Sequence, residues 1–300
     1  MALAPRIVVV HRRSELDELV DRHATYGQAE FFLRSRGRDI AAVQARHDAV
    51  EAALTTVVDA VPDGFRQARV ERSELDRYLF APEDVIVAVG QDGLVANVAK
   101  YLRGQPVVGV DPEPGINAGV LVPFRPAEAR AQMLAVARGT AAVSERAMVE
   151  ARLDDGQSLV ALNDVYVGSP GHQSSRWTLD VPARGREQQS CSGLIAGTGT
   201  GSTGWISSIA ADRGLGARLP APESDDVAWF VREAWASPAT GTALGWGVAT
   251  GERPLAITAQ SDLLVAFGDG IERDRLSIGF GQRLSIGPAS SRLRLVVRGR

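Results

Sequence analysis

The chain has 300 residues, of which 45% are hydrophobic and 23% are charged, and its formal net charge is −3. This composition is that of a globular protein, and the lack of a basic excess argues against nucleic-acid binding. The single cysteine, Cys191, excludes an internal disulfide framework and fits a reducing compartment, so we expect a cytoplasmic protein. The apolar run at residues 7–10 is too short for a signal peptide or a membrane-spanning helix, and no membrane partner is expected.

The first part of the chain alternates between buried-strand patterns and helix patterns. This alternation indicates a parallel sheet with right-handed crossovers, so residues 1–124 are predicted to form a Rossmann-like α/β domain. The strand patterns cover residues 7–10, 68–70, 85–90 and 106–110, and the helix patterns cover residues 14–23, 39–60 and 96–102.

After the Pro- and Gly-rich segment 111–124, which is typical of a crossing between domains, one helix is predicted at residues 125–139. Strand patterns then dominate, and Asp155-Gly156 is a hairpin turn signal. Residues 125–290 are therefore predicted to form a mostly antiparallel β domain, with the tail 291–300 packing back on the first domain. Residues 216–251, which contain three of the tryptophans, are expected to be a loop that covers the site or builds an oligomer contact. The strands are expected at residues 147–153, 159–167, 177–181, 194–196, 256–258, 263–267 and 293–297.

The stretch VIVAVGQDG, residues 85–93, organises the first domain. Its apolar run predicts a strand buried on both faces, and Gly90 and Gly93 permit a tight turn and a close approach of the backbone to a ligand. The helix that follows offers free N–H groups to a phosphate. Asp92 stands in this turn, at the carboxyl end of a strand, where ligands bind in open α/β sheets. On this stretch alone, Asp92 either faces a ligand or simply caps the helix.

A second candidate is ALNDV, in which Asn163 and Asp164 interrupt an apolar strand pattern. Neighbouring residues on a strand point to opposite faces, so both side chains can meet one ligand only at a bulge or a strand end. The alternative is an Asx turn at the end of a strand.

A third candidate is SGLIAGTGTGSTGW, residues 192–205, followed by a helical stretch at residues 206–211. Such a glycine-rich loop can wrap a ligand with backbone N–H groups and hydroxyls. It is not a Walker A loop, because no G-K-[ST] is present, and the chain has no G-x-G-x-x-G after a strand. Trp205 either stacks on a purine or is an ordinary core tryptophan. The hydroxyl-bearing candidates of this loop are Ser192, Thr198, Thr200, Ser202 and Thr203.

Taken together and in this order, four segments resemble the NAD kinase family, and most of all its mitochondrial-type branch. They are VGQDGLVANVAKYL, PVVGVDPEPGINAGVLVPF, ALNDVYVG and SGLIAGTGTGSTGW. The resemblance spans roughly residues 85–210, with a vaguer fit at residues 263–297. It implies the two-domain fold of that family, with the site in the crevice between the domains, and a homodimer or a higher homo-oligomer.

The resemblance also implies ATP-dependent phosphorylation of the 2′-hydroxyl on the adenosine ribose of NAD, with Mg²⁺ or another divalent metal as cofactor. Asp92 matches the acid that takes the hydroxyl proton or helps to hold the metal. Asn163 and Asp164 match the pair that binds the dinucleotide's ribose. The positions that enclose adenine correspond to Thr203, Gly204, Trp205 and Ser208.

Four residues depart from the family pattern: Gln91 replaces a glycine, Leu94 a threonine, Ser192 an aspartate of most members, and Ile271 a glutamine. Two other functions stay open, the first because of the departures at Gln91 and Ile271. One is a dinucleotide-binding protein of this fold without catalytic activity. The other is a kinase of another alcohol, such as a lipid or a sugar, since the glycine–aspartate turn is shared with such enzymes.

Overall fold

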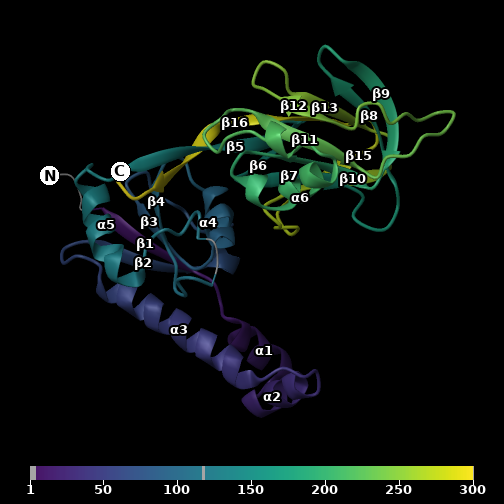
Figure 1. The fold of residues 1–300 in the computed structure, drawn as a ribbon. Coiled ribbons are helices and arrows are strands. Elements are labelled where there is room, and N and C mark those ends of the chain that lie inside the picture. Colours follow the sequence, from purple (N-terminus) through teal and green to yellow (C-terminus); the bar gives the residue numbers. More distant parts are fainter. Residues whose placement is uncertain (1–4, 117–118, 300) are drawn as a thin grey trace. The chain divides into compact units, whose positions relative to one another are not determined.

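The computed structural model describes residues 5–116 and 119–299, which fall into two compact units (Figure 1). The first unit comprises Met1–Ser144 and Arg294–Arg300, and the second comprises Glu145–Leu293. The division lies one helix later than the expected boundary after residue 124. The reason is that helix α5 (Ala129–Ala137) buries Ala129 and Met133 in the core of the first unit. Two residues of the crossing segment, 117 and 118, lie outside the described residues.

The first unit is built on parallel strands in the order β2-β1-β3-β4, as the alternation of patterns predicts. The last residues of β16 (Arg283–Val296), Arg294 and Leu295, pair parallel with β4, so the C-terminal segment extends this sheet. The other strands are β1 (Arg6–His11), β2 (Arg66–Glu71), β3 (Val85–Val89) and β4 (Pro106–Val110).

Helices cover both faces of this sheet. Alternate strand residues such as Val9 and Val87 share one cluster with α3 (Ile40–Asp59) and α5, so these two helices lie on one face. Helix α4 (Asp92–Ala99) packs on β3 and β4. Ser14 and Asp39 cap α1 (Glu15–His23) and α3, which form where the helix patterns at residues 14–23 and 39–60 predict them. Helix α2 (Tyr26–Arg34) was not predicted, because it buries only Ala29 and Leu33 and so leaves a weak apolar pattern.

The second unit consists of two sheets packed face to face (Figure 1). One is wholly antiparallel, with the order β12-β11-β10-β7-β14-β15; the other contains β16, β13, β8 and β9, with β5 and β6 attached. The prediction of a mostly antiparallel domain is confirmed. The strands are β5 (Val143–Leu153), β6 (Ser158–Ala161), β7 (Asp164–Gly168), β8 (Ser175–Val181), β9 (Gly185–Cys191), β10 (Gly193–Gly197), β11 (Val227–Arg232), β12 (Trp246–Ala249), β13 (Leu255–Ala259), β14 (Leu263–Gly268) and β15 (Arg275–Gly279).

Two sequence expectations for the second unit are wrong. The single strand expected at residues 159–167 is two strands, β6 and β7, separated by a bend at Leu162 and Asn163. The loop expected at residues 216–251 contains β11 and β12, and β11 lies between β10 and β12 with Trp229 buried. Residues on both faces of β11 are buried, so the run VAWFVR is almost entirely apolar. It therefore lacks the alternation of apolar and polar residues that marks a half-exposed strand.

Helix α6 (Trp205–Asp212) covers the outer face of the six-stranded sheet. Its Ile206 and Ala210 pack against Ile195 of β10 and against Ala228 and Phe230 of β11. Within the described residues, no helix is both long enough and apolar enough to cross a bilayer.

Candidate functional site

The GQDG turn of the first unit joins β3 to α4. All five residues of β3 are buried, and α4 begins at Asp92 with Gln91 as its N-cap. Gln91 has φ −88° and ψ 168°, an ordinary extended conformation, so the side chain at this glycine position of the family introduces no backbone strain. Leu94, which replaces a threonine, is buried and lies directly beneath Gly90.

The carboxylate of Asp92 does not cap the helix. It accepts hydrogen bonds from two consecutive backbone amides, at 3.1 Å from the nitrogen of Val120 and 2.9 Å from that of Leu121. Each oxygen accepts one bond, and a carboxylate can accept about four, so half-buried Asp92 keeps acceptor capacity for a hydroxyl or a cation. The capping interpretation of this residue is therefore wrong.

The segment that contains Val120 and Leu121 can approach strand β4 closely because of a glycine that the sequence analysis did not select. Gly109 lies in β4, and a Cβ built on it would overlap the backbone carbonyl of Leu121. The amide of Asp111 donates to Phe124 at 2.8 Å and so fixes the far end of the same segment. The contact of Asp92 with this segment therefore requires a glycine at this position of the strand PVVGV.

In the second unit, Asn163 and Asp164 lie at a strand end, the arrangement in which both side chains can face one ligand. Asn163 stands in the bend before β7, and Asp164 is the first residue of β7. Both are half-buried. Asp164 pairs with Gly197 of β10, and the amide of Thr198, directly after β10, donates to the carbonyl of Asn163 at 2.9 Å. No described residue donates a hydrogen bond to the Asn163 or Asp164 side-chain oxygens, so an Asx turn is not formed here.

Asp164 has a strongly perturbed acidity. Desolvation by burial raises the pKa of its carboxyl to about 6, from an ordinary value of 3.8. No charged neighbour contributes to this shift, so the group lacks the partners that would stabilise its ionised form. A desolvated acid of this kind is a frequent mark of a functional site.

A residue that the sequence reasoning did not select holds this bend in place. Asp269, at the end of β14, accepts hydrogen bonds of 2.8 Å from the backbone amides of both Leu162 and Asn163. Its φ is +52°, a conformation that aspartate tolerates better than most residues. The signal that could have found it is the Asp-Gly pair directly before Ile271, since Asp-Gly is typical of a turn.

The glycine-rich loop after β10 packs tightly against the same bend. A Cβ on Gly201 would overlap the backbone carbonyl of Asn163, and one on Gly199 would overlap Ala221. The hydroxyl of Thr198 donates to Leu162 at 2.6 Å and accepts from the amides of Thr200 and Gly201. These glycines and Thr198 therefore have a structural role in holding the loop against the bend.

Most donors of this loop are used within the protein. The hydroxyl of Ser202 donates to Thr198, and that of Thr203 to Thr200. Thr200 is the exception, because it is 5% exposed and its buried hydroxyl has no partner. An orphaned buried hydroxyl is rare and marks a place where a ligand or a water completes the structure.

The residues expected around adenine lie together at the start of α6. Trp205 and Ser208, one helical turn apart, are both exposed, as are Thr203 and Gly204. Trp205 is 42% exposed and is therefore not a core tryptophan. Ser192 is also exposed, at the junction of β9 and β10.

Trp205 belongs to an aromatic surface. Its ring stacks on Tyr166 of β7, with centroids 5.9 Å apart and planes at 12°, and the guanidinium of Arg232 lies 5.0 Å from the ring centroid. Tyr166 donates through its hydroxyl to Ser192 at 2.9 Å, and burial raises the pKa of this phenol. Sequence reasoning missed Tyr166, whose ring fits because Gly168 and Gly193 beside it have no side chains.

Cys191 takes no part in this surface. It is fully buried, and burial raises the pKa of its thiol to about 12, so the thiol stays protonated and unreactive. Among the described residues, no three or more His, Cys, Asp or Glu side chains gather to hold a metal. A magnesium ion brought by a nucleotide needs only one or two carboxylates from the protein, which Asp92 fits.

Comparisons with known proteins agree with the resemblance found in the motifs. The chain is 30% identical to the NAD kinase of Chlorobaculum tepidum over 157 residues, which are 52% of this chain and 51% of that protein. It is 25% identical to human mitochondrial NAD kinase 2 over 254 residues, covering 68% of this chain and 58% of that protein. No family model matches the chain. The chain spans between half and three fifths of the length of the curated relatives it matches.

Solved structures of the family share the fold. A yeast NADH kinase complexed with NADH has a TM-score of 0.62 at 12% identity, covering 99% of this chain and 84% of its own. An NAD kinase from Archaeoglobus fulgidus in complex with ATP has a TM-score of 0.58 at 18% identity, covering 97% of this chain and 93% of its own. The resemblance to the NAD kinase family is confirmed. The NAD kinase fold includes both the parallel sheet of the first unit and the antiparallel sheet of the second.

Proposed function

We propose that this protein transfers the γ-phosphoryl group of ATP to the 2′-hydroxyl on the adenosine ribose of NAD, giving NADP. The observation that carries the proposal is the surface beside the Asn163 bend, where an exposed tryptophan stacked on a tyrosine adjoins a desolvated acid without protein partners. A flat aromatic face suits a purine, and amide and carboxyl oxygens suit ribose hydroxyls.

Asp92 is proposed to act at the acceptor hydroxyl. In the reaction, the ribose 2′-oxygen forms a bond to the γ-phosphorus while the bond from phosphorus to the β–γ bridging oxygen breaks, and ADP leaves. The hydroxyl proton passes to the carboxylate of Asp92, whose orientation is fixed by the amides of Val120 and Leu121. Asp92 is the residue that would hold a divalent cation brought by ATP, and such a cation would supply neutralisation of the phosphate charge.

Two of the departures from the family pattern, Gln91 and Ile271, do not argue against an active site. Gln91 is exposed and unstrained, and Ile271 donates its amide to Gly268 at 3.1 Å in an intact turn. Neither residue distorts the groups around Asp92 or Asn163. A dinucleotide-binding protein without activity therefore has no structural observation in its favour.

The test is to incubate the purified protein with ATP, Mg²⁺ and NAD and to measure NADP with a dehydrogenase specific for the 2′-phosphate. Substituting Asp92→Asn should lower kcat by about 10²–10⁴-fold if the carboxylate is a general base. Asp76→Asn, an exposed acid of the same unit, is the matched control and should leave kcat unchanged. NAD carrying 2′-deoxyadenosine should yield no product.

The alternatives give different results in the same assays. A protein that binds NAD in calorimetry but forms no NADP, with Asp92→Asn behaving as the wild type, is a binding protein. Turnover of ATP with a lipid or sugar alcohol, but not with NAD, identifies a kinase of another alcohol. Either result would refute the proposal.

A further inference from the structure

We propose that Arg146 and Thr200 form a site that binds a phosphate group of one of the two nucleotides, an inference that rests on the function proposed above. Within the described residues, four buried side-chain nitrogen or oxygen atoms have no hydrogen-bond partner. Two of them are the Nε of Arg146 and the Oγ1 of Thr200, and both residues belong to the second unit. Buried polar atoms are almost always paired in folded proteins, so these two require an explanation.

The two residues adjoin one short segment of the chain, which begins at Ala221. Arg146 lies on β5, and the amide of the next residue donates to the carbonyl of Pro222 at 3.2 Å. Thr200 follows Gly199, on which a Cβ would lie 2.1 Å from the carbonyl of Ala221. The start of β5 and the glycine-rich loop are therefore both held against consecutive residues of the same segment.

The hydroxyl of Thr200 has no role within the loop that contains it. Thr200 is 5% exposed, its amide donates to the hydroxyl of Thr198 at 3.1 Å, and its carbonyl accepts from the hydroxyl of Thr203 at 3.3 Å. The hydroxyls of Thr198, Ser202 and Thr203 all make hydrogen bonds inside the loop. A valine would fill the place of Thr200 without burying an unpaired polar group, so the hydroxyl calls for a partner from outside the protein.

The charge of Arg146 is weakly compensated by the protein. Its side chain is only 13% exposed, and a guanidinium cannot lose its proton to avoid the cost of burial. The acid within ion-pair distance is Glu223, which lies 3.8 Å away, beyond hydrogen-bond distance, and is 57% exposed. Arg292 donates to the carbonyl of Glu223 at 3.2 Å and is itself paired with Asp225, so no net negative charge gathers here.

An oxyanion matches this pair of groups. A neutral ligand would leave the charge of Arg146 uncompensated, and a cation would be repelled by it. A phosphate group can accept from the guanidinium through one oxygen and from the hydroxyl of Thr200 through another, because it offers several acceptor oxygens. Both substrates of the proposed reaction carry such groups, ATP in its triphosphate and NAD in its diphosphate.

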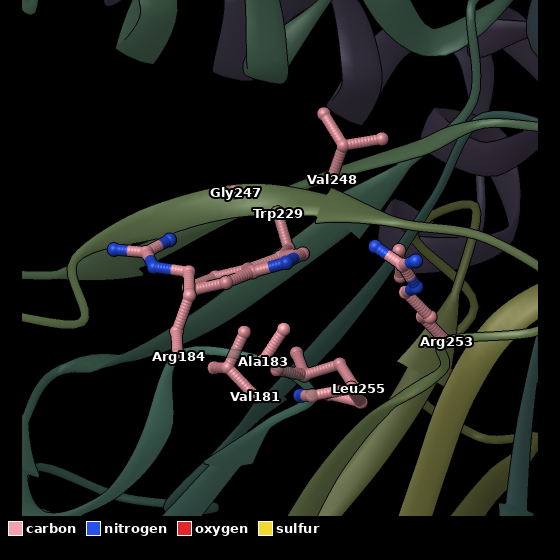
Figure 2. A pocket seen from close by; sticks show the side chains of 10 residues that line it. Val181, Ala183, Arg184, Trp229, Gly247, Val248, Arg253 and Leu255 are labelled. Carbon is pink, nitrogen blue, oxygen red and sulfur yellow. The ribbon is translucent and has the colours of Figure 1, made fainter.

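The first experiment measures the binding of inorganic pyrophosphate to the full chain by calorimetry and does not depend on turnover. Arg146→Met, which keeps an apolar stem, and Thr200→Val should each weaken binding by about tenfold, the effect of losing a hydrogen bond to a charged group. Arg253→Met is the matched control and should leave binding unchanged. Figure 2 shows Arg253 beside a small cavity near Trp229 in the same unit, and its side chain is exposed.

A second measurement separates ligand binding from a structural role. Because neither atom has a protein partner, Thr200→Val and Arg146→Met should unfold without ligand at the same temperature as the wild type or at a higher one. Saturating pyrophosphate should raise the unfolding temperature of the wild type more than that of either variant, since it binds the folded wild type more tightly. A lower unfolding temperature of both variants without ligand would show that these groups stabilise the protein itself and would overturn the proposal.

Steady-state kinetics then identify the nucleotide. If the phosphate belongs to ATP, Thr200→Val should raise the KM for ATP by about tenfold and keep the KM for NAD; the reverse pattern assigns the diphosphate of NAD. Failure of the proposed function would appear as a wild type that forms no NADP, and the pyrophosphate titration would still test the site. Absence of pyrophosphate binding, unchanged affinity in either variant, or unchanged KM values for both nucleotides would each refute the assignment.

Discussion

The Asp92 turn of the first unit and the Asn163 bend of the second use acidic residues in opposite ways. In the turn, the acid that matches the family's catalytic residue also binds two consecutive backbone amides, those of Val120 and Leu121. In the bend, Asp269 binds the two backbone amides, and Asp164 is left without a protein partner. In the proposed function, the first unit therefore combines fixation and ligand contact in one carboxylate, whereas the second divides them between two.

This difference teaches that a motif aspartate cannot be assigned a role from its neighbours in sequence. Asp92 and Asp269 each precede a glycine, yet Asp92 is the one proposed to take a proton. What distinguishes them is the segment that each one fixes. The predictions below test that division, beginning with the residue that fixes the bend.

Replacing Asp269 should have the largest effect on stability. Asp269→Ala removes the acceptor of two amides at 2.8 Å and should lower the free energy of unfolding by about 2–4 kcal/mol. The KM for NAD should rise as well, because the Asn163 side chain loses its fixed position. Asp269→Asn keeps one oxygen and tolerates φ +52°, so it should lose about half as much stability. Urea unfolding and initial-rate kinetics measure both effects, and equal stability of wild type and Asp269→Ala would contradict the assignment.

Replacing Asp164 should raise, rather than lower, the free energy of unfolding at neutral pH. Because burial raises the folded-state pKa of this acid to about 6, the folded protein keeps a proton that the unfolded chain releases above pH 4. Stability is therefore lost as the pH rises from about 4 through 6. Well above pH 6 this loss of stability is complete and amounts to about 2–3 kcal/mol. Asp164→Asn, which cannot ionise, should be more stable than the wild type by this amount.

The control for this prediction is a comparison of wild type and Asp164→Asn at two pH values. Well below pH 3.8 the carboxyl is protonated in both the folded and the unfolded state, and wild type and Asp164→Asn should then have equal unfolding free energies. Denaturant titrations at about pH 2.5–3 and at about pH 8 are sufficient. A stabilisation that is the same at both values would show that packing, rather than ionisation, is responsible.

Replacing Trp205 should affect binding and leave stability almost unchanged. Stacking of a base on an aromatic side chain contributes about 1–3 kcal/mol, so Trp205→Ala should raise the KM for NAD by about tenfold. Trp205 is 42% exposed and Trp235 is 44% exposed, which makes Trp235→Ala a matched control that should keep the KM of the wild type. Similar KM values for the two variants would exclude Trp205 from the adenine site.

Much of the fold could be predicted because the apolar patterns are strong. The strands VIVAV and PVVGV and the capped helices α1 and α3 are written in local sequence. Asn163, Asp164 and Trp205 could likewise be selected from their motifs. Asp269, Tyr166 and Gly109 could not, because each acts on a segment distant in the chain. Only the folded backbone shows which amide, ring or carbonyl meets them.

The smallest effect is predicted for Gly93 of the first region, which differs from Gly201, the motif glycine of the second. A Cβ on Gly201 would overlap the carbonyl of Asn163, so Gly201→Ala should destabilise the second unit. A Cβ on Gly93 meets nothing within 4 Å, and Gly93 lies in the first turn of α4. Gly93→Ala should therefore stabilise the protein by about 0.5–1 kcal/mol. If kcat/KM for ATP falls in this more stable variant, the open space at Gly93 is used by the substrate; if it is unchanged, this glycine does not contact a phosphate.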